Sequence, residues 1–167
     1  MVQPNISSRG FTLIELLVAL SIAAILFMWV LPVQQDFFLK NKLSARTEEI
    51  ISALHYARSQ AILLGQPLIL APQSENWSSG MLLFIDLNDN HVYDSSDKLI
   101  FQWQWQEKDL DLLWNGLYEN YLLFTPIGLN SVLGGTFYVC SKNSGKKILM
   151  NRLGRVRVEE VEESCHT

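Results

Sequence analysis

The segment with the strongest chemical character is basic and lies near the C-terminus. Residues 142–157 carry no acid and six cations: Lys142, Lys146, Lys147, Arg152, Arg155 and Arg157. In a strand, Arg155 and Arg157 project from the same face, and neighbouring guanidinium groups repel each other unless an anion bridges them. The phosphates of a nucleic-acid backbone meet that demand. Gly154 permits either a tight turn or the close approach of such a backbone.

The same arginines also fit a solvated strand face. Glutamates follow the basic segment at positions 159, 160, 162 and 163. They offer ion-pair partners to Arg155 and Arg157 without any ligand. Composition alone favours this second interpretation. The net charge of −4 argues against a wholly basic nucleic-acid binder and leaves a local basic patch open.

A second polar cluster, residues 86–97, has the spacing of a calcium-binding loop. Positions 1, 3, 5, 9 and 12 of an EF-type loop are filled by Asp86, Asn88, Asn90, Asp94 and Asp97. However, His91 stands at the sixth position, where the sharp turn requires glycine, and the twelfth ligand is aspartate rather than a bidentate glutamate. The flanks also have the pattern of strands. We therefore expect a polar hairpin turn and no bound metal.

Enzymatic motifs are absent from the sequence. It contains no GxSxG, HExxH or P-loop pattern and no Cys-x-x-Cys pair, and its three histidines are scattered. We therefore predict that the chain is not an enzyme and has no catalytic residues, no cofactor and no zinc site.

The two cysteines, Cys140 and Cys165, flank the basic segment. In an oxidising compartment the simplest outcome is one disulfide, which closes a loop of about 25 residues.

The N-terminal part of the chain is apolar enough to span a bilayer. Residues 11–31 contain a single charge, Glu15, and a membrane helix needs about 20 apolar residues. Arg9 precedes the run, which places that end in the cytoplasm. A carboxylate is costly in a membrane. Glu15 is therefore either an acid tolerated near the helix end or one that finds a positive partner when helices pack together.

The rest of the sequence predicts an α+β protein. Apolar residues recur at three- or four-residue steps between 33 and 64, which indicates an amphipathic helix that ends near Gly65. Short apolar segments bounded by Gly, Asn and Ser then predict strands at 67–71, 80–86, 98–106, 121–126, 135–141, 146–151 and 154–160. Strict alternation in 98–106 predicts one buried face in that strand. We expect one long helix packed on an antiparallel β-sheet.

The segment RGFTLIELLVALSIAAIL, residues 9–26, resembles the leader and first helix of type IV pilins and type II secretion pseudopilins. The resemblance implies that prepilin peptidase cuts between Gly10 and Phe11 and that the new N-terminal Phe11 is N-methylated. It also implies that Glu15 meets the N-terminal amine of a neighbouring subunit, which gives the acid a positive partner. The expected domains are residues 1–10 (leader), 11–32 (transmembrane and assembly helix), 33–65 (amphipathic helix) and 66–167 (β-rich globular domain).

Further segments are similar to the GspH/FimT branch of that family. They are ALHYARSQAILLGQPLIL at 53–70 and NWSSGMLLFIDLNDNHVYDSSDKLI at 76–100. In addition, GRVR at 154–157 followed by Cys165 resembles the C-terminal pattern of FimT-type minor pilins, where it is linked to DNA binding in natural transformation. The resemblance implies that Gly154, Arg155 and Arg157 bind DNA. An electrostatic extension of that set adds Lys142, Lys146, Lys147 and Arg152.

These features lead to one functional hypothesis and two alternatives. The hypothesis is a FimT-like minor type IV pilin, single-pass in the inner membrane with a periplasmic C-terminal domain and later part of an extracellular pilus. Its partners are double-stranded DNA, other major and minor pilins and prepilin peptidase, and Cys140 and Cys165 form a disulfide that tethers the C-terminal tail. The main alternative is a GspH-like minor pseudopilin of type II secretion that touches partner subunits and not DNA, and a further one is a purely structural minor pilin that primes pilus assembly. The leader does not discriminate between them.

Overall fold

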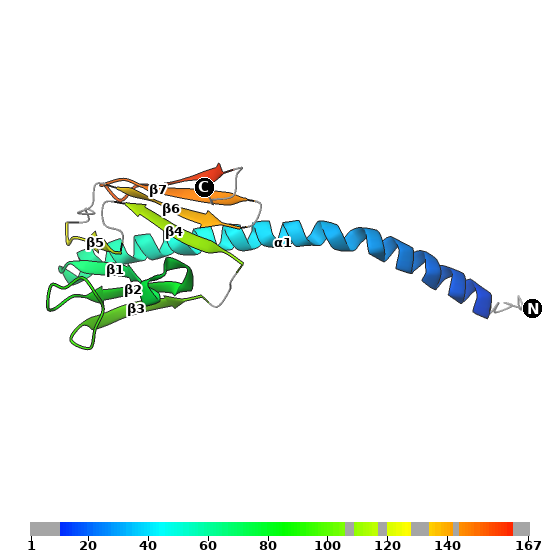
Figure 1. Ribbon diagram of the computed structural model, residues 1–167, viewed down its shortest axis with the longest axis horizontal. Coiled ribbons are helices and arrows are strands. Elements are labelled where there is room, and N and C mark those ends of the chain that lie inside the picture. The colour runs from blue at the N-terminus through cyan, green and yellow to red at the C-terminus, as the bar shows by residue number, and fades with distance from the viewer. Residues whose placement is uncertain (1–10, 106–108, 117–119, 128–133, 142–143, 162–167) are drawn as a thin grey trace, which may run out of the picture. The chain divides into compact units, whose positions relative to one another are not determined.

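The protein is represented by a computed structural model that describes residues 11–105, 109–116, 120–127, 134–141 and 144–161, with the side chains of 28–36 outside that description. The chain divides into two compact units, residues 1–39 and 40–167. The strands of the described chain all lie in the second unit, together with the C-terminal part of the helix (Figure 1).

One helix, α1 (Leu13–Leu64), contains both of the helical segments that the sequence predicts, and it continues through Pro32. Its side chains from Leu13 to Phe27 are exposed, apart from half-buried Ala23. Among the residues that the structure describes, no helical stretch is both long enough and apolar enough to cross a membrane.

The part of α1 in the second unit has one buried face. Leu43, Ile50, Leu54, Ala57 and Ala61 are at most 3% exposed. Their spacing places them along one side of a helix. The small alanine side chains let the helix backbone approach the sheets closely. The predicted amphipathic helix is thus a core element, and no ligand is needed to explain its apolar stripe.

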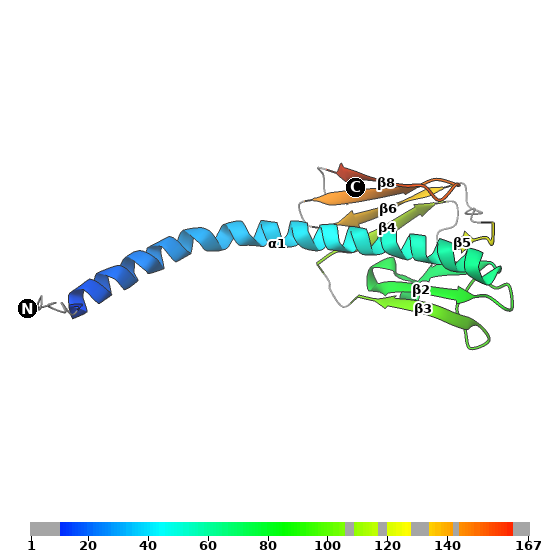
Figure 2. The same ribbon diagram turned by 180° about the vertical axis from the view of Figure 1, so that it is seen from behind.

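The strands form two four-stranded sheets rather than one. The first has the order β3-β2-β1-β5 and the second β4-β6-β7-β8, and every pairing is antiparallel. The bounds are β1 Leu68–Pro72, β2 Gly80–Ile85, β3 Lys98–Gln104, β4 Asp111–Gly116, β5 Leu122–Phe124, β6 Gly135–Cys140, β7 Gly145–Met150 and β8 Val156–Val161. Short 3-10 turns occupy Gln73–Glu75 and Trp77–Ser79. Figure 2 shows both sheets along the C-terminal part of α1.

Both sheets contribute to one hydrophobic core with α1. Leu70 and Leu83 of the first sheet, Phe137 and Ile148 of the second and Ile50 of α1 belong to a single cluster of buried residues. The α+β fold class predicted from the sequence is confirmed. Burial of this much apolar surface is the main force that holds a helix against two sheets.

Strand β4 was not predicted, although its sequence alternates. Leu110 and Leu112 are buried and Trp114 is half-buried, and the residues between them, Asp111 and Leu113, are exposed. The strand pairs with β6 over its whole length. The apolar Leu113 at an exposed position and Gly116 at the end of the strand obscure the alternation in the sequence.

The predicted buried face of β3 is wrong. None of its residues is buried, and Leu99 and Phe101 are 39% and 44% exposed. The register with β2 shifts at Ile100, so that Phe101 pairs with Leu83 and Leu99 with the adjacent Phe84. Such a bulge inserts an extra residue and turns the next residues of the strand to the other face. β3 is also an edge strand, so one of its sides has no neighbouring strand to cover it.

Candidate functional site

The GRVR segment lies at the turn between β7 and β8, and the side chain of Asn151 organises that turn. Asn151 Oδ1 accepts hydrogen bonds from the backbone N–H of Leu153 (3.1 Å) and of Arg155 (2.9 Å). The backbone N–H of Gly154 donates to the Asn151 carbonyl (2.9 Å), and that of Asn151 donates to the Arg155 carbonyl (3.1 Å). Arg155 therefore belongs to the turn, and β8 begins at Val156.

Gly154 is buried and has φ of +72°, in the left-handed region that favours glycine. A Cβ at this position would lie 2.9 Å from Nη1 and 3.2 Å from Cζ of Arg58, a residue of α1. Of the two roles that the sequence allows, the tight turn is present. The end of the Arg58 side chain lies next to the space that a Cβ would occupy.

Arg155 and Arg157 line the same shallow hollow, whose volume is about 410 Å³. Its floor includes Gly134, Gly135 and Thr136 at the start of β6. None of the described residues that line it is acidic. Both arginines are exposed, so their guanidinium groups can reach an anion placed over the hollow. The structure thus brings together the two arginines that the sequence singles out.

Arg157 also has the acidic neighbour that the alternative interpretation predicts. Its Nε lies 3.4 Å from Oε1 of Glu159, and the two side chains are 79% and 42% exposed. An ion pair this exposed is worth little, with a median of about 0–1 kcal/mol. Arg157 is therefore not buried by its partner. For Arg155, the described part of the chain shows no ion pair.

The lysines do not all lie with the arginines. Lys147 is paired in register with Tyr138 and Glu159 and has its ammonium 5.5 Å from the centre of the Tyr138 ring. Residues paired across two strands project from the same face, so Lys147 shares a face with Glu159. Arg157 precedes Glu159 by two residues on β8 and therefore projects from that face as well. Lys146 projects from the opposite face, where its Nζ donates to Ser44 Oγ of α1 (3.1 Å).

The remaining predicted residues are two cations, Lys142 and Arg152, and the two cysteines. Arg152 is exposed in the turn. Lys142 and Cys165 lie outside the described residues. Cys140 is buried at the end of β6 and is not a free thiol. Because Cys165 is not described, its pairing with Cys140 stays a prediction.

The acidic loop between β2 and β3 uses its side chains to fold itself. Asp86 accepts hydrogen bonds from the backbone N–H groups of Asn88 (3.2 Å) and His91 (2.8 Å). Asp97 accepts from those of Leu87 and Asp94, both at 3.0 Å. The hydroxyl and backbone N–H of Ser96 and the side chain of Asn88 hold the pKa of Asp94 at about 2. These contacts are those of the polar hairpin turn that the sequence predicts.

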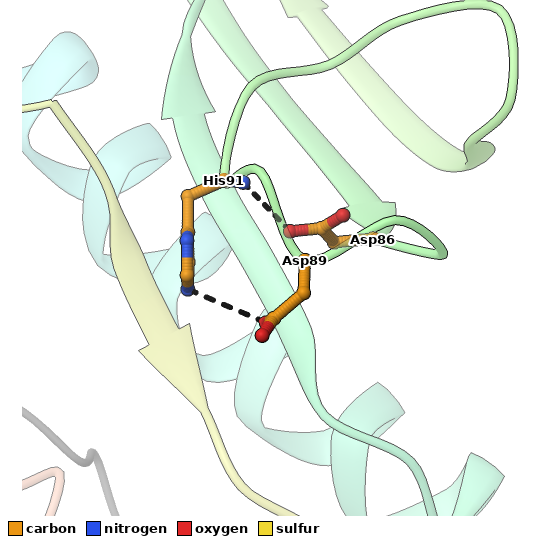
Figure 3. Close-up of side chains that lie close together, drawn as sticks. All are labelled: Asp86, Asp89 and His91. Carbon is orange, nitrogen blue, oxygen red and sulfur yellow. Dashed lines mark hydrogen bonds and ion pairs between the residues drawn. The ribbon is translucent and has the colours of Figure 1, made fainter.

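Within this loop, potential metal-ligand atoms of Asp86, Asp89 and His91 lie within 4.8 Å of one another. Figure 3 shows the Asp86 carboxylate toward the backbone of His91 and Asp89 beside the imidazole, with Nε2 and Oδ1 3.8 Å apart. The ring of His91 stacks on Tyr121 at 4.5 Å between centroids. Asp86 and His91 thus have partners within the protein, whereas the Asp89 side chain is 97% exposed.

At the start of α1, Thr12 and Glu15 form a capping box. The Glu15 carboxylate accepts from the backbone N–H and the hydroxyl of Thr12, both at 2.9 Å, while Thr12 Oγ1 accepts from the Glu15 N–H at 3.3 Å. Such a pair satisfies N–H groups that have no partner within the helix. Glu15 thus has a local role that neither sequence interpretation included. Gly10 lies outside the described residues, and Phe11 is 90% exposed.

Sequence reasoning missed three residues that shape these sites. The Thr-x-x-Glu spacing of Thr12 and Glu15 is a visible signal of a helix start. An Asn three residues before a Gly, as in Asn151 and Gly154, is a weaker signal of a turn. Arg58 carries no such signal, because only the packing of α1 against the hairpin brings it to Gly154.

The fold and the N-terminal motif define a pilin-like subunit. Residues 46–154 match the family described as type II transport protein GspH, and residues 6–31 match the prokaryotic N-terminal methylation motif. The chain belongs to the GspH family of minor type IV pilins and pseudopilins, which confirms the predicted membership. The family match ends at Gly154, so it does not include Arg155 and Arg157.

A curated relative and two solved structures are similar to this chain. The pilin-like protein PilA1 of Thermus thermophilus is 30% identical over 156 residues, covering 90% of this chain and 98% of that protein. The type IV minor pilin FimU of Pseudomonas aeruginosa has a TM-score of 0.59 at 20% identity, covering 77% of this chain and 96% of FimU. The minor pseudopilin EpsH of the Vibrio cholerae type 2 secretion system has a TM-score of 0.52 at 16% identity, covering 70% and 95%.

Proposed function

We propose that this chain is a minor type IV pilin that binds double-stranded DNA through the β7–β8 hairpin and supports DNA uptake in natural transformation. The observation that carries the proposal is that exposed Arg155 and Arg157 line one hollow, in which no described lining residue is acidic. Two guanidinium groups over a shared hollow suit an anion with several oxygens, such as a backbone phosphate.

Binding of this kind is electrostatic and independent of base sequence. The described chain has no free helix at the hairpin that could enter a major groove, and two arginines on a strand and turn contact phosphates more readily than base edges. The affinity of one subunit should be modest, because the chain has a net charge of −4. Several copies in a filament would raise it by avidity.

The N-terminal part supports assembly in the same proposal. Prepilin peptidase cuts after Gly10, Phe11 becomes the methylated N-terminus, and Glu15 faces the amine of a neighbouring pilin. Residues 11–32 form the single pass through the inner membrane, with the β-rich domain in the periplasm before it enters the pilus. The match of residues 6–31 to the methylation motif supports this arrangement.

The second candidate is a minor pseudopilin of type II secretion without DNA binding. It is favoured by the Arg157–Glu159 ion pair, which gives one arginine a partner of its own. The family description and the likeness to EpsH fit it as well. In this role the hairpin would touch neighbouring subunits.

A salt titration separates the two candidates. The full-length chain in non-ionic detergent is titrated with a short DNA duplex at several salt concentrations, alongside Arg155→Gln/Arg157→Gln. The matched control is Lys40→Gln/Lys98→Gln, which removes the same two charges from α1 and β3. Loss of two phosphate contacts should lower the slope of log affinity against log salt by about 1.8. The pseudopilin role is favoured if the affinity and the salt slope of the Arg155→Gln/Arg157→Gln variant equal those of the control. It is also favoured if the wild type does not bind DNA at low salt.

A further inference from the structure

Arg58 reaches the GRVR turn from a distant part of the chain. It lies on α1, and its Nη1, Cζ and Cδ atoms are 2.9, 3.2 and 3.3 Å from where a Cβ on residue 154 would stand. A side chain at residue 154 would therefore require the end of the Arg58 side chain to move. A guanidinium group of the helix therefore lies beside residue 154, the residue that precedes Arg155.

The charge of Arg58 has no counterion in the described part of the chain. No carboxylate among the described residues forms an ion pair with it, and none of their hydrogen bonds involves it. Arg46, also on α1, is different: its Nε lies 3.4 Å from Glu49 Oε2, and its guanidinium lies 4.2 Å from the centre of the Trp105 ring. Arg46 is 9% exposed and built into the core, whereas Arg58 is half-buried.

A half-buried cation without a partner is unfavourable, and an external anion relieves that cost. We propose that Arg58 is a third cation of the DNA-binding surface and contacts a backbone phosphate at the hairpin tip. This inference rests on the proposed function. Arg58 approaches the turn from the helix, and Arg155 and Arg157 line the hollow on the strands.

The arrangement makes the binding surface a composite of α1 and the β7–β8 hairpin. Arg58 lies near residue 154, and the Cα atom of Arg155 is the next one along the chain, about 3.8 Å away. The guanidinium group of Arg58 can satisfy several phosphate oxygens, which an ammonium group does less well. Gly154 contributes by leaving room for Arg58 rather than by meeting DNA itself.

The test uses the full-length chain in non-ionic detergent and a DNA duplex over a series of salt concentrations. Arg58→Gln should weaken binding about tenfold and lower the salt slope by about 1. Arg58→Lys should keep the slope and bind with intermediate affinity. The matched control, Lys98→Gln on β3, should leave both values near those of the wild type. Thermal melts of each variant report whether folding is retained.

A role in bracing the turn alone gives a different result. In that case Arg58→Gln lowers the melting temperature and the affinity while the salt slope stays that of the wild type, which would overturn the proposal.

A second measurement needs no variant: phenylglyoxal modification of arginines in the wild-type chain, read by mass spectrometry. DNA should protect Arg58 together with Arg155. Equal modification of Arg58 with and without DNA contradicts the proposal.

Failure of this inference differs from failure of the proposed function. If the wild type binds DNA and depends on Arg155 and Arg157 but not on Arg58, only the third cation is lost. If the wild type does not bind DNA at low salt, the result contradicts both the proposed function and the role of Arg58.

Discussion

Arg157 and Glu159 lie on the same face of β8 with Nε and Oε1 3.4 Å apart. In this pair, the acid neutralises one of the two arginines that line the hollow. The same contact therefore supports a structural role for Arg157 and limits its availability to an anion. Both side chains are exposed enough for water and salt to screen the pair. The ion pair is therefore weak, and Arg157 stays available to an anion.

Glu159→Gln should strengthen DNA binding by up to about fivefold, which corresponds to the upper range of an exposed ion pair. Arg157 loses its competitor while the side chain keeps its length. The measurement is the affinity for a DNA duplex at fixed salt. Glu48→Gln, an exposed acid on α1, is the control that changes the net charge equally. Equal gains in the two variants would mean that overall charge, not the pair, sets affinity.

Gly154→Ala should destabilise the fold through two separable effects. The left-handed backbone costs about 1–2 kcal/mol for a residue with a Cβ, and the contact with Arg58 adds to that cost. Gly65→Ala is the matched control, since Gly65 has φ of +64° with nothing within 4 Å of its Cβ position. In an Arg58→Ala background the contact disappears, so the double-mutant cycle should give a coupling of about 0.5–1 kcal/mol. Chemical denaturation measures all four free energies of unfolding, and strict additivity would argue against the contact.

Thr12→Ala should loosen the first turn of α1. Loss of an N-cap hydroxyl costs about 1 kcal/mol, or roughly a fivefold change in a local opening equilibrium. Amide hydrogen exchange of the full-length chain in detergent should therefore be faster at Glu15, whose N–H donates to Thr12 Oγ1. Thr12→Ser keeps the hydroxyl and should exchange like the wild type. Unchanged exchange in the alanine variant would show that the capping box does not govern this end of the helix.

The loop between β2 and β3 should lose order in acid. Hydrogen bonds from Ser96 and Asn88 lower the pKa of Asp94 from 3.8 to about 2. A folded-state pKa below the unfolded value means that the stabilisation is present above about pH 4 and is lost as the pH falls toward 2. Carboxyl resonances followed by NMR should give this low pKa, and Asp94→Asn should remove the transition. Titration of Asp94 near 3.8 would contradict the hydrogen-bonded loop.

Much of the architecture could be predicted, because local patterns carry it. Segments around Leu70, Leu83 and Phe137 combine apolar runs with turn residues, and all became strands. β3 shows the limit of such patterns. Its alternation in sequence is strict, yet the bulge at Ile100 and its edge position decide which side chains are covered.

For the candidate site, the sequence alone determined the family, the two strands of the hairpin and the pair of arginines two residues apart, although it placed Arg155 within the strand rather than in the turn. The tertiary structure decided which cations meet. It placed Lys146 on the helix side of its sheet, gave Arg157 an exposed acidic partner, and brought Arg58 to Gly154. The reason is physical: local backbone geometry fixes which residues share a strand face, whereas contacts between remote segments depend on how a helix and two sheets bury their apolar sides together.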